Sequence, residues 1–276
     1  MPLEDELGDI LQKARDGKDW SRSDLVKATD LQDNDLQKIE SYQLTPDDAD
    51  VLKLAQALDL DGPALIDIAK EQWEPEAPAY DPDFDLVTLN VFMGEYPVNC
   101  FLVRCKETGE TAVVDTGANP KTIIAKAKEM GVRPSKILLT HAHPDHAGGL
   151  GQLSSAFECP TYIDHKEPKP SGSSNFIVVK EGDEITLGKL KINCLETPGH
   201  TLGGVSYLIN KTLISGDVIF AGSMGRANSS WSDLFDSITK KVLRLPDDTA
   251  IHPGHGPATT VGQEKKHNPF FKGRVG

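Results

Sequence analysis

The chain has 276 residues, 38% hydrophobic and 26% charged, which is typical of a folded globular protein. Its apolar stretches are shorter than the roughly 20 residues that cross a bilayer, and the acidic start "MPLEDELGDI" lacks the features of a secretory signal. Of the formal net charge of −13, −11 falls in residues 1–75, which hold 8 Lys and Arg against 19 Asp and Glu. We therefore expect a cytoplasmic protein with no membrane partner, built from two units with different roles.

Residues 1–73 are predicted to form an all-helical domain, because apolar residues recur there at three- and four-residue spacing. The expected helices span 7–14, 23–30, 33–41, 46–58 and 62–73. Three prolines follow in "EPEAPAYDPD" (74–83). Proline lacks a backbone donor and restricts the residue before it, so this stretch is predicted to be an extended linker.

From Phe84 onward the pattern changes to short apolar strands separated by turns. The expected strands span 85–92, 99–105, 111–117, 136–141, 160–164, 190–196, 204–210, 212–217 and 249–252. Two helices are expected in this part, at 120–130 and 231–243. Strands mixed with few helices indicate an α+β domain over residues 84–276, in which helices cover sheets.

The segment "THAHPDHAGG" (140–149) places four candidate metal ligands directly after the buried strand "KILLT". Imidazole and carboxylate are the usual ligands of Zn²⁺ and similar metals. His141 and His143 occupy alternate positions and can direct two imidazoles the same way, whereas Asp145 and His146 can reach a point on the other side. The spacing therefore predicts part of a metal site at a strand end.

One turn cannot enclose a metal ion, and three further candidates follow at glycine-containing turns. His200 lies in "TPGHT", Asp217 in "SGD" and His255 in "HPGHG", each after a predicted strand. Five histidines and two aspartates are enough for two metal ions that share one carboxylate. A single loop histidine is more often a solvated side chain. That interpretation is preferred for three others: His165, His252 and His267.

In this order the seven residues resemble the metallo-β-lactamase superfamily over about residues 84–276. The resemblance implies an αββα sandwich with two metal ions at one edge of the sheets. In the implied assignment, metal 1 is held by His141, His143 and His200, metal 2 by Asp145, His146 and His255, and Asp217 bridges the two. Asp115 matches a family aspartate that supports the histidine ligands through hydrogen bonds. Asp145 is also the residue to which we assign a catalytic role.

Two metal ions about 3.5–4 Å apart lower the pKa of a shared water, so that hydroxide can attack an electrophilic carbonyl or phosphoryl centre at neutral pH. We expect two divalent ions per chain, with Zn²⁺ preferred and Fe or Mn²⁺ as alternatives. The sequence therefore predicts a metal-dependent hydrolase.

Residues 215–230 and 245–270 resemble the glyoxalase II-like branch, which cleaves glutathione thioesters. Arg226 falls where that branch carries a basic residue that contacts glutathione, and the alternative is a surface arginine. The chain departs from the branch at Asn228, where a tyrosine is usual, and after "HNPFFKGRVG" it shows no C-terminal helical domain. The expected substrate is a small-molecule thioester such as S-acylglutathione. The runner-up is a persulfide dioxygenase with a single iron.

Residues 7–70 resemble a Cro/C1-type helix-turn-helix domain, through "LGDILQKARDGKDWSRSDLVKATDLQDNDLQKIES" and "DADVLKLAQALDL". The resemblance implies DNA binding through a recognition helix at 33–41. DNA affinity depends on Lys and Arg that neutralise phosphates, and this helix holds three acids and one lysine. We therefore favour protein interaction or homodimerisation for this unit. A metal-binding transcriptional regulator stays the alternative of another class.

Overall fold

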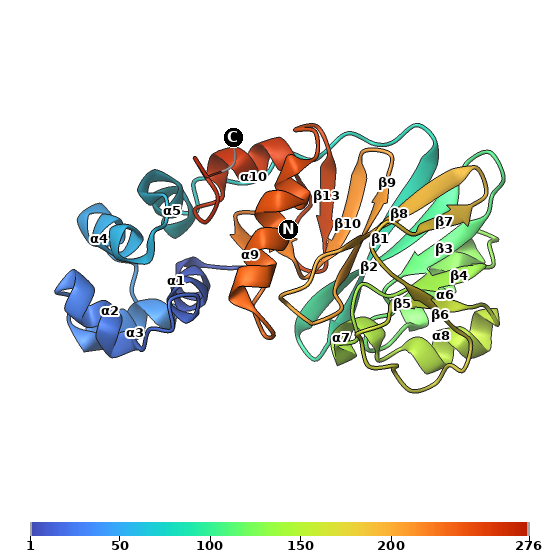
Figure 1. Cartoon of the computed structure of the whole chain (residues 1–276), viewed down its shortest axis with the longest axis horizontal. Coiled ribbons are helices and arrows are strands. Elements are labelled where there is room, and N and C mark those ends of the chain that lie inside the picture. The colour runs from blue at the N-terminus through green and yellow to red at the C-terminus, as the bar shows by residue number, and fades with distance from the viewer. Residues whose placement is uncertain (1, 275–276) are drawn as a thin grey trace.

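Five short helices form one end of the molecule in the computed structural model, which describes residues 2–274 (Figure 1). They are α1 (Leu7–Asp16), α2 (Arg22–Thr29), α3 (Asp33–Glu40), α4 (Asp48–Leu58) and α5 (Gly62–Ala69). Side-chain oxygens of Ser21, Asp47 and Asp61 accept hydrogen bonds from backbone N–H groups in the first turns of α2, α4 and α5. Such caps satisfy N–H groups that a helix start leaves unpaired, so part of the acidic composition serves to define these helices.

Two six-stranded sheets follow, and residues 74–83, which form neither helix nor strand, lead into them. The first sheet has the order β1 (Phe84–Met93), β2 (Tyr96–Cys105), β3 (Thr111–Val114), β4 (Lys136–Leu138), β5 (Thr161–Asp164) and β6 (Phe176–Val179). The second has the order β14 (Thr259–Thr260), β13 (Ala250–Pro253), β10 (Thr212–Gly216), β9 (Val205–Ile209), β8 (Leu190–Glu196) and β7 (Glu184–Leu187). A small hairpin joins β11 (Ile219–Phe220) and β12 (Ser223–Met224).

The two sheets pack face to face, and alternate residues of each strand serve different cores. Phe101 and Val103 of β2 point into the core between the sheets, where they meet Tyr207 and Ile214 of the second sheet. Leu102, the residue between them, packs on the outer side of the first sheet against helices. Strands buried on both faces explain the continuous apolar runs in the sequence.

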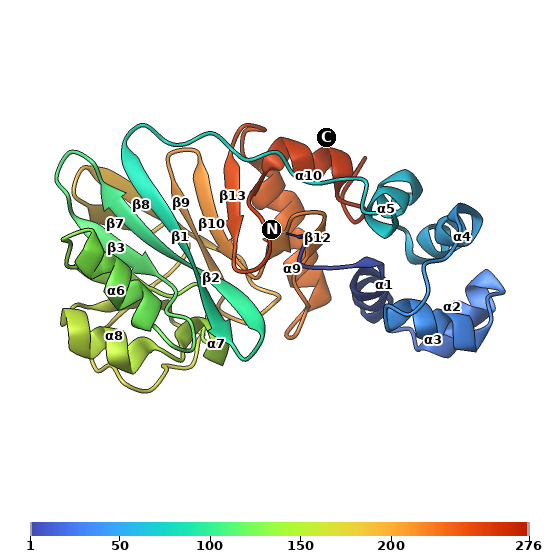
Figure 2. The ribbon, with the colours of Figure 1, turned by 180° about the vertical axis from the view of Figure 1, so that it is seen from behind.

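Helices cover both outer faces and complete four layers (Figures 1 and 2). The first sheet is covered by α6 (Lys121–Glu129) and α8 (Leu150–Phe157), with the one-turn α7 (Pro144–Ala147) at its edge. The second sheet is covered by α9 (Trp231–Lys240) and α10 (Val261–His267), with the 3-10 turn η1 (Val242–Arg244) between them. No helix within residues 2–274 has the length and apolar character required to cross a membrane.

The five N-terminal helices share a hydrophobic core with α9 and α10, in addition to their link through residues 74–83. This core joins Leu11 and Leu65 of the N-terminal helices to Leu234 of α9 and to Phe270 and Phe271 after α10. The acidic unit is therefore packed on the second helical layer. Figure 2 shows its first residues running from α1 toward β12.

The expectation of only two helices after Phe84 is wrong, because α7, α8 and α10 are also present. Helix α8 follows Gly148 and Gly149, whose presence suggested a turn, and it has only eight residues. The strands β6 and β7 were also not predicted, since four-residue segments with mixed exposure carry little periodic signal.

Candidate metal centre

The seven candidate ligands meet at one edge of the sandwich because each follows a strand. His141 comes three residues after β4, and Pro144 starts the single turn of α7, where its fixed φ suits the first helical position. Asp217 follows β10 and His255 follows β13, and these two strands are parallel neighbours. Carboxyl ends of parallel strands lie at the same sheet edge, so both side chains arrive together.

Three histidines form the first cluster: His141, His143 and His200. Nδ1 of His143 lies 3.1 Å from Nε2 of His141 and 3.0 Å from Nε2 of His200. His141 is 2% exposed and His200 8%, so the nitrogens converge in a place from which water is largely excluded. Three imidazoles that present nitrogens to one point suit a divalent cation.

The second cluster contains Asp145, His146, Asp217 and His255. Nε2 of His146 lies 3.2 Å from Oδ1 of Asp217, and Nε2 of His255 lies 3.5 Å from both Asp145 Oδ2 and Asp217 Oδ2. Oδ2 of Asp217 is also 3.6 Å from Nε2 of His200 in the first cluster. The carboxylate of Asp217 therefore lies between the two clusters.

Four of the histidines are held in the same tautomer by hydrogen bonds on their far side. Nδ1 of His200 donates to the carbonyl of Arg226 at 2.7 Å, and Nδ1 of His255 to the carbonyl of Pro97 at 3.0 Å. Nδ1 of His146 donates to Oδ2 of Asp115 at 2.8 Å. Because Nδ1 carries the proton in each ring, the Nε2 lone pair faces the site, as metal binding requires.

His141 reaches the same state through Thr140. The Thr140 hydroxyl donates to Asp115 Oδ2 at 2.8 Å, so its oxygen accepts from Nδ1 of His141 at 3.0 Å. The backbone N–H of Thr140 donates to the other oxygen of Asp115 at 2.8 Å. Asp115, which is fully buried, thus orients His146 directly and His141 through Thr140.

The buried polar atoms of the second cluster fit a cation. Nε2 of His146 and Oδ1 of Asp217 have no hydrogen-bond partner although both are buried, which is costly unless an ion binds between them. Burial opposes charge on His146, yet Asp217 and Asp115 raise its pKa well above the usual value. Burial likewise opposes charge on His255, but hydrogen bonds with Asp145 and Asp217 raise its pKa to about 10. The buried carboxylates therefore require positive charge at this point.

Backbone approaches the second cluster closely at Gly254. A Cβ atom there would lie 2.3 Å from Oδ1 of Asp217 and 2.6 Å from Cε1 of His146. The first glycine of "HPGHG" is therefore required by space, since any side chain would displace both candidate ligands.

The side chain of Arg226 is engaged by the N-terminal helices. Its Nη1 donates to Oδ2 of Asp16 in α1 at 3.0 Å, and both side chains are about half exposed. Glu4, at the start of the chain, lies 3.9 Å from Nδ1 of His255. One side of the centre is thus bordered by acidic residues of the N-terminal unit.

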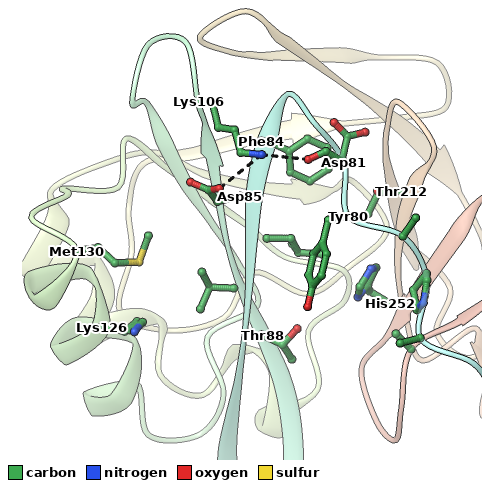
Figure 3. Close-up of a pocket in the computed structure, with 16 residues that line it drawn as sticks. Tyr80, Asp81, Phe84, Asp85, Thr88, Lys106, Lys126, Met130, Thr212 and His252 are labelled. Carbon is green, nitrogen blue, oxygen red and sulfur yellow. Dashed lines mark hydrogen bonds and ion pairs between the residues drawn. The ribbon is translucent and has the colours of Figure 1, made fainter.

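A cavity of about 720 Å³ lies away from these clusters (Figure 3). It is bounded by residues 77–81, by strand β1, by Met130 directly after α6, and by His252 of β13. Figure 3 shows Tyr80 between β1 and His252. Cavity size alone would therefore have indicated the wrong place, and the chemistry of the donor atoms is the better guide.

A family model decides the relationship. The model of the metallo-beta-lactamase superfamily matches residues 93–255, a stretch that contains both clusters. The chain belongs to the metallo-beta-lactamase superfamily. The α+β fold expected for this family is present, and the clusters support binding of divalent metal ions by a metallo-hydrolase.

Several known proteins are similar over 58% to 66% of this chain. A probable metallo-hydrolase of Bacillus subtilis, YqgX, is 37% identical over 183 residues, which is 58% of this chain and 87% of that protein. The hydroxyacylglutathione hydrolase GloC of Haemophilus influenzae is 30% identical over 205 residues, 64% of this chain and 97% of its own length. The crystal structure of TTHA1623 in a di-iron-bound form is 32% identical, with a TM-score of 0.59, and covers 66% of this chain and 99% of that one.

Residues missed by sequence reasoning in this superfamily member include Thr140, Pro97 and Glu167. Thr140 stands beside the histidine motif, but its role depends on a hydroxyl whose direction the sequence does not reveal. Pro97 acts through its carbonyl, which every residue has. Glu167 lies in "DHKEPKP", a loop with no catalytic pattern, and it accepts two backbone hydrogen bonds described below.

Proposed function

We propose that the protein is a dinuclear metal-dependent hydrolase that cleaves thioesters, with S-acylglutathiones as the substrates to test first. The observation that carries the proposal is the set of four histidines held as Nδ1–H tautomers, whose Nε2 atoms face the carboxylate of Asp217. This arrangement supports two neighbouring ions, with Asp217 between them.

When bound, two divalent ions supply a water-derived nucleophile of lowered pKa and stabilise negative charge on an attacked carbonyl oxygen. His141, His143 and His200 would hold one ion, and Asp145, His146 and His255 the other. Asp115 keeps the rings oriented, since it accepts from His146 and from Thr140. Asp145 has the more exposed carboxylate, 20% against 8% for Asp217, so it is the acid that can contact substrate or exchange a proton with it.

The thioester is proposed from similarity to GloC of Haemophilus influenzae, a protein named as a hydroxyacylglutathione hydrolase and matched over 97% of its length. Arg226 is the expected contact for a carboxylate of glutathione, but it already forms an ion pair with Asp16. The choice of glutathione as the thiol carrier therefore has less support than the thioester itself. Zn²⁺ is the preferred metal for this donor set, and the di-iron form of TTHA1623 keeps iron as an alternative beside Mn²⁺.

The test is the loss of thioester absorbance when S-lactoylglutathione is mixed with chain reconstituted with Zn²⁺, Fe²⁺ or Mn²⁺. We expect cleavage by the wild type and a loss of at least about 100-fold in the His255→Ala variant, which lacks a ligand of the second ion. Glu184→Gln serves as the control, because this side chain is exposed on β7 and belongs to none of the groups that could hold a metal ion. Full activity of His255→Ala with one ion per chain would overturn the two-ion proposal. The iron-loaded chain is also tested for oxygen uptake with glutathione persulfide. Oxygen uptake without thioester cleavage would favour the persulfide dioxygenase.

For the N-terminal unit we propose a role in protein contacts, and not in DNA binding. Arg22, at the start of α2, is paired with Asp33 of α3 at 2.8 Å. Arg22 is thus occupied within the unit, and the first turn of the expected recognition helix carries Asp33 and Asp35, a poor match for phosphates. A band shift of genomic fragments at low salt tests this proposal, since retardation by the whole chain would restore the regulator hypothesis.

A further inference from the structure

Glu167 joins two loops that carry all three members of the first cluster. Its Oε2 accepts a hydrogen bond from the backbone N–H of Ala142 at 2.8 Å, and its Oε1 accepts one from Gly203 at 3.0 Å. Ala142 lies between His141 and His143, and Gly203 lies three residues after His200. We propose that Glu167 is a positioning residue, whose carboxylate fixes the distance between the two loops and thereby the geometry of the first metal site.

The Glu167 carboxylate and the two N–H groups that it binds are largely shielded from water. Glu167 is 6% exposed, so its charge is stabilised by the two N–H groups that it accepts from, and they lack an alternative water partner. Hydrogen bonds to an ionised carboxylate are roughly twice as strong as those between neutral groups. A bridge of this kind is suited to holding loop tips that strand pairing does not reach.

The loop around Gly203 is shaped to receive Glu167. A Cβ at position 203 would lie 3.0 Å from Cγ of Glu167, 2.8 Å from its backbone nitrogen and 2.7 Å from Oδ1 of Asp164. Asp164 in turn accepts from the N–H of Lys166 at 2.8 Å and holds the turn that presents Glu167. The glycine thus permits the close approach on which the bridge depends.

The second cluster has separate supports. The backbone carbonyl of His146 accepts from the N–H of Thr116 at 2.7 Å, and its ring donates to Asp115. The ring of His255 is held by Pro97. Loss of the Glu167 bridge should therefore weaken the first site and leave the second nearly unchanged. This inference rests on the proposed two-ion centre.

The test is metal binding by the complete chain, first stripped of metal and then titrated with Zn²⁺ in competition with a chromophoric chelator. Glu167→Gln keeps the size of the side chain, but its amide offers one acceptor oxygen and one NH₂ donor to two N–H groups. We expect one of the two sites to lose about 10- to 100-fold in affinity, as is typical when a hydrogen-bond partner of the ligand loops is removed. Glu184→Gln, an exposed change on β7, should bind as the wild type does.

Two further backgrounds identify the affected site. In His143→Ala, which loses the first site, adding Glu167→Gln should leave the remaining affinity unchanged. In His255→Ala, which loses the second site, adding it should weaken the remaining affinity by the same 10- to 100-fold. Metal-free Glu167→Gln should still unfold in one cooperative transition, with a thermal midpoint within roughly 10 °C of the metal-free wild type, because one buried N–H group loses its acceptor while the scaffold stays folded.

Three results would overturn the inference: unchanged affinities in Glu167→Gln, equal loss at both sites, or loss of the cooperative unfolding transition in the metal-free variant. A wild-type chain that binds fewer than two ions would instead overturn the two-ion centre itself. The two failures can be told apart. A failure of the two-ion centre appears in the wild type, whereas a failure of the Glu167 inference appears only in the variant.

Discussion

The guanidinium of Arg226 donates a hydrogen bond to the carboxylate of Asp16, with 3.0 Å between Nη1 and Oδ2. Through its backbone carbonyl the same arginine accepts from the ring of His200 at 2.7 Å. One residue thus connects the metal centre to the first helix of the acidic unit. The side chain expected to bind substrate already has an anionic partner within the chain.

If Arg226 contacts a substrate carboxylate, Asp16 competes with that substrate. Asp16→Ala should lower KM for S-lactoylglutathione by about two- to fivefold, since an exposed ion pair is worth roughly 0.2–1 kcal/mol. The KM for a thioester of uncharged N-acetylcysteamine should not change. Asp33→Ala, which breaks an ion pair elsewhere in the same unit, is the matched control. An equal change with both substrates would argue against a carboxylate contact at Arg226.

Asp115→Asn tests the support of the histidine rings. Asp115 has a φ of +58°, in the left-handed region that asparagine tolerates, so the backbone should be preserved. The asparagine NH₂ group would face either His146 or Thr140, both of which now donate to a carboxylate. We expect kcat and metal affinity to fall by about 10- to 100-fold. Metal content per chain and kcat measure this, and unchanged values would exclude the proposed role.

The buried pair of Lys13 and Asp5 anchors α1 beside the centre. Lys13 also donates to the carbonyl of Met224 at 2.7 Å and lies 5.0 Å from the ring centroid of Phe220. Lys13→Met would leave Asp5 buried without its cation. We expect the free energy of unfolding in urea to fall by about 3–5 kcal/mol, with partial recovery in Lys13→Met/Asp5→Asn. A cost below about 1 kcal/mol would show that the pair does not hold the unit in place.

His252, expected from the sequence to be solvated, is instead buried, and it predicts an acid dependence of stability. Burial lowers its pKa to about 4, whereas an unfolded histidine titrates near pH 6.5. Between these values the unfolded chain binds more protons, so acidification from pH 7 through 4 favours unfolding. We compare the free energies of unfolding of His252→Gln and the wild type in the presence of a chelator, which removes metal. The difference in favour of His252→Gln should grow by about 2 kcal/mol as the pH falls from 7.5 to 4.5. Urea unfolding at several pH values measures it, with half-exposed His165→Gln as control. A difference that stays constant with pH would contradict the prediction.

The sequence predicted the candidate site well where residues with metal-binding side chains follow predicted strands. The seven residues of the two clusters stand in loops or in the single turn α7 that follow strands, and their side-chain types limit what they can bind, so their convergence could be predicted. Contacts that distant segments make through backbone groups could not be predicted from the sequence. Ala142 and Gly203 bind Glu167 through N–H groups that every non-proline residue carries, and nothing in their side chains announces it.

The same limit applies to Arg226 and to the packing of the helices. Similarity pointed to a substrate contact for Arg226, but its partner, Asp16, lies 210 positions away in the chain. The apolar spacing of α1–α5 showed that each helix has a buried face, without showing what covers it. Trp231 and Phe270 are part of the cover, and only the folded chain brings them there.

Residues 74–83 mark a change in sequence pattern, but the two parts on either side of them are not independent in the fold. Helices α1–α5 share one hydrophobic core with α9 and α10. A chain shortened to begin at Phe84 would uncover Trp231 and Phe270, which lie beside Gly17 and Leu58, and exposed apolar surfaces of this kind promote aggregation. It would also lack the acidic border contributed by Glu4 and Asp16. The two parts should therefore melt in a single transition.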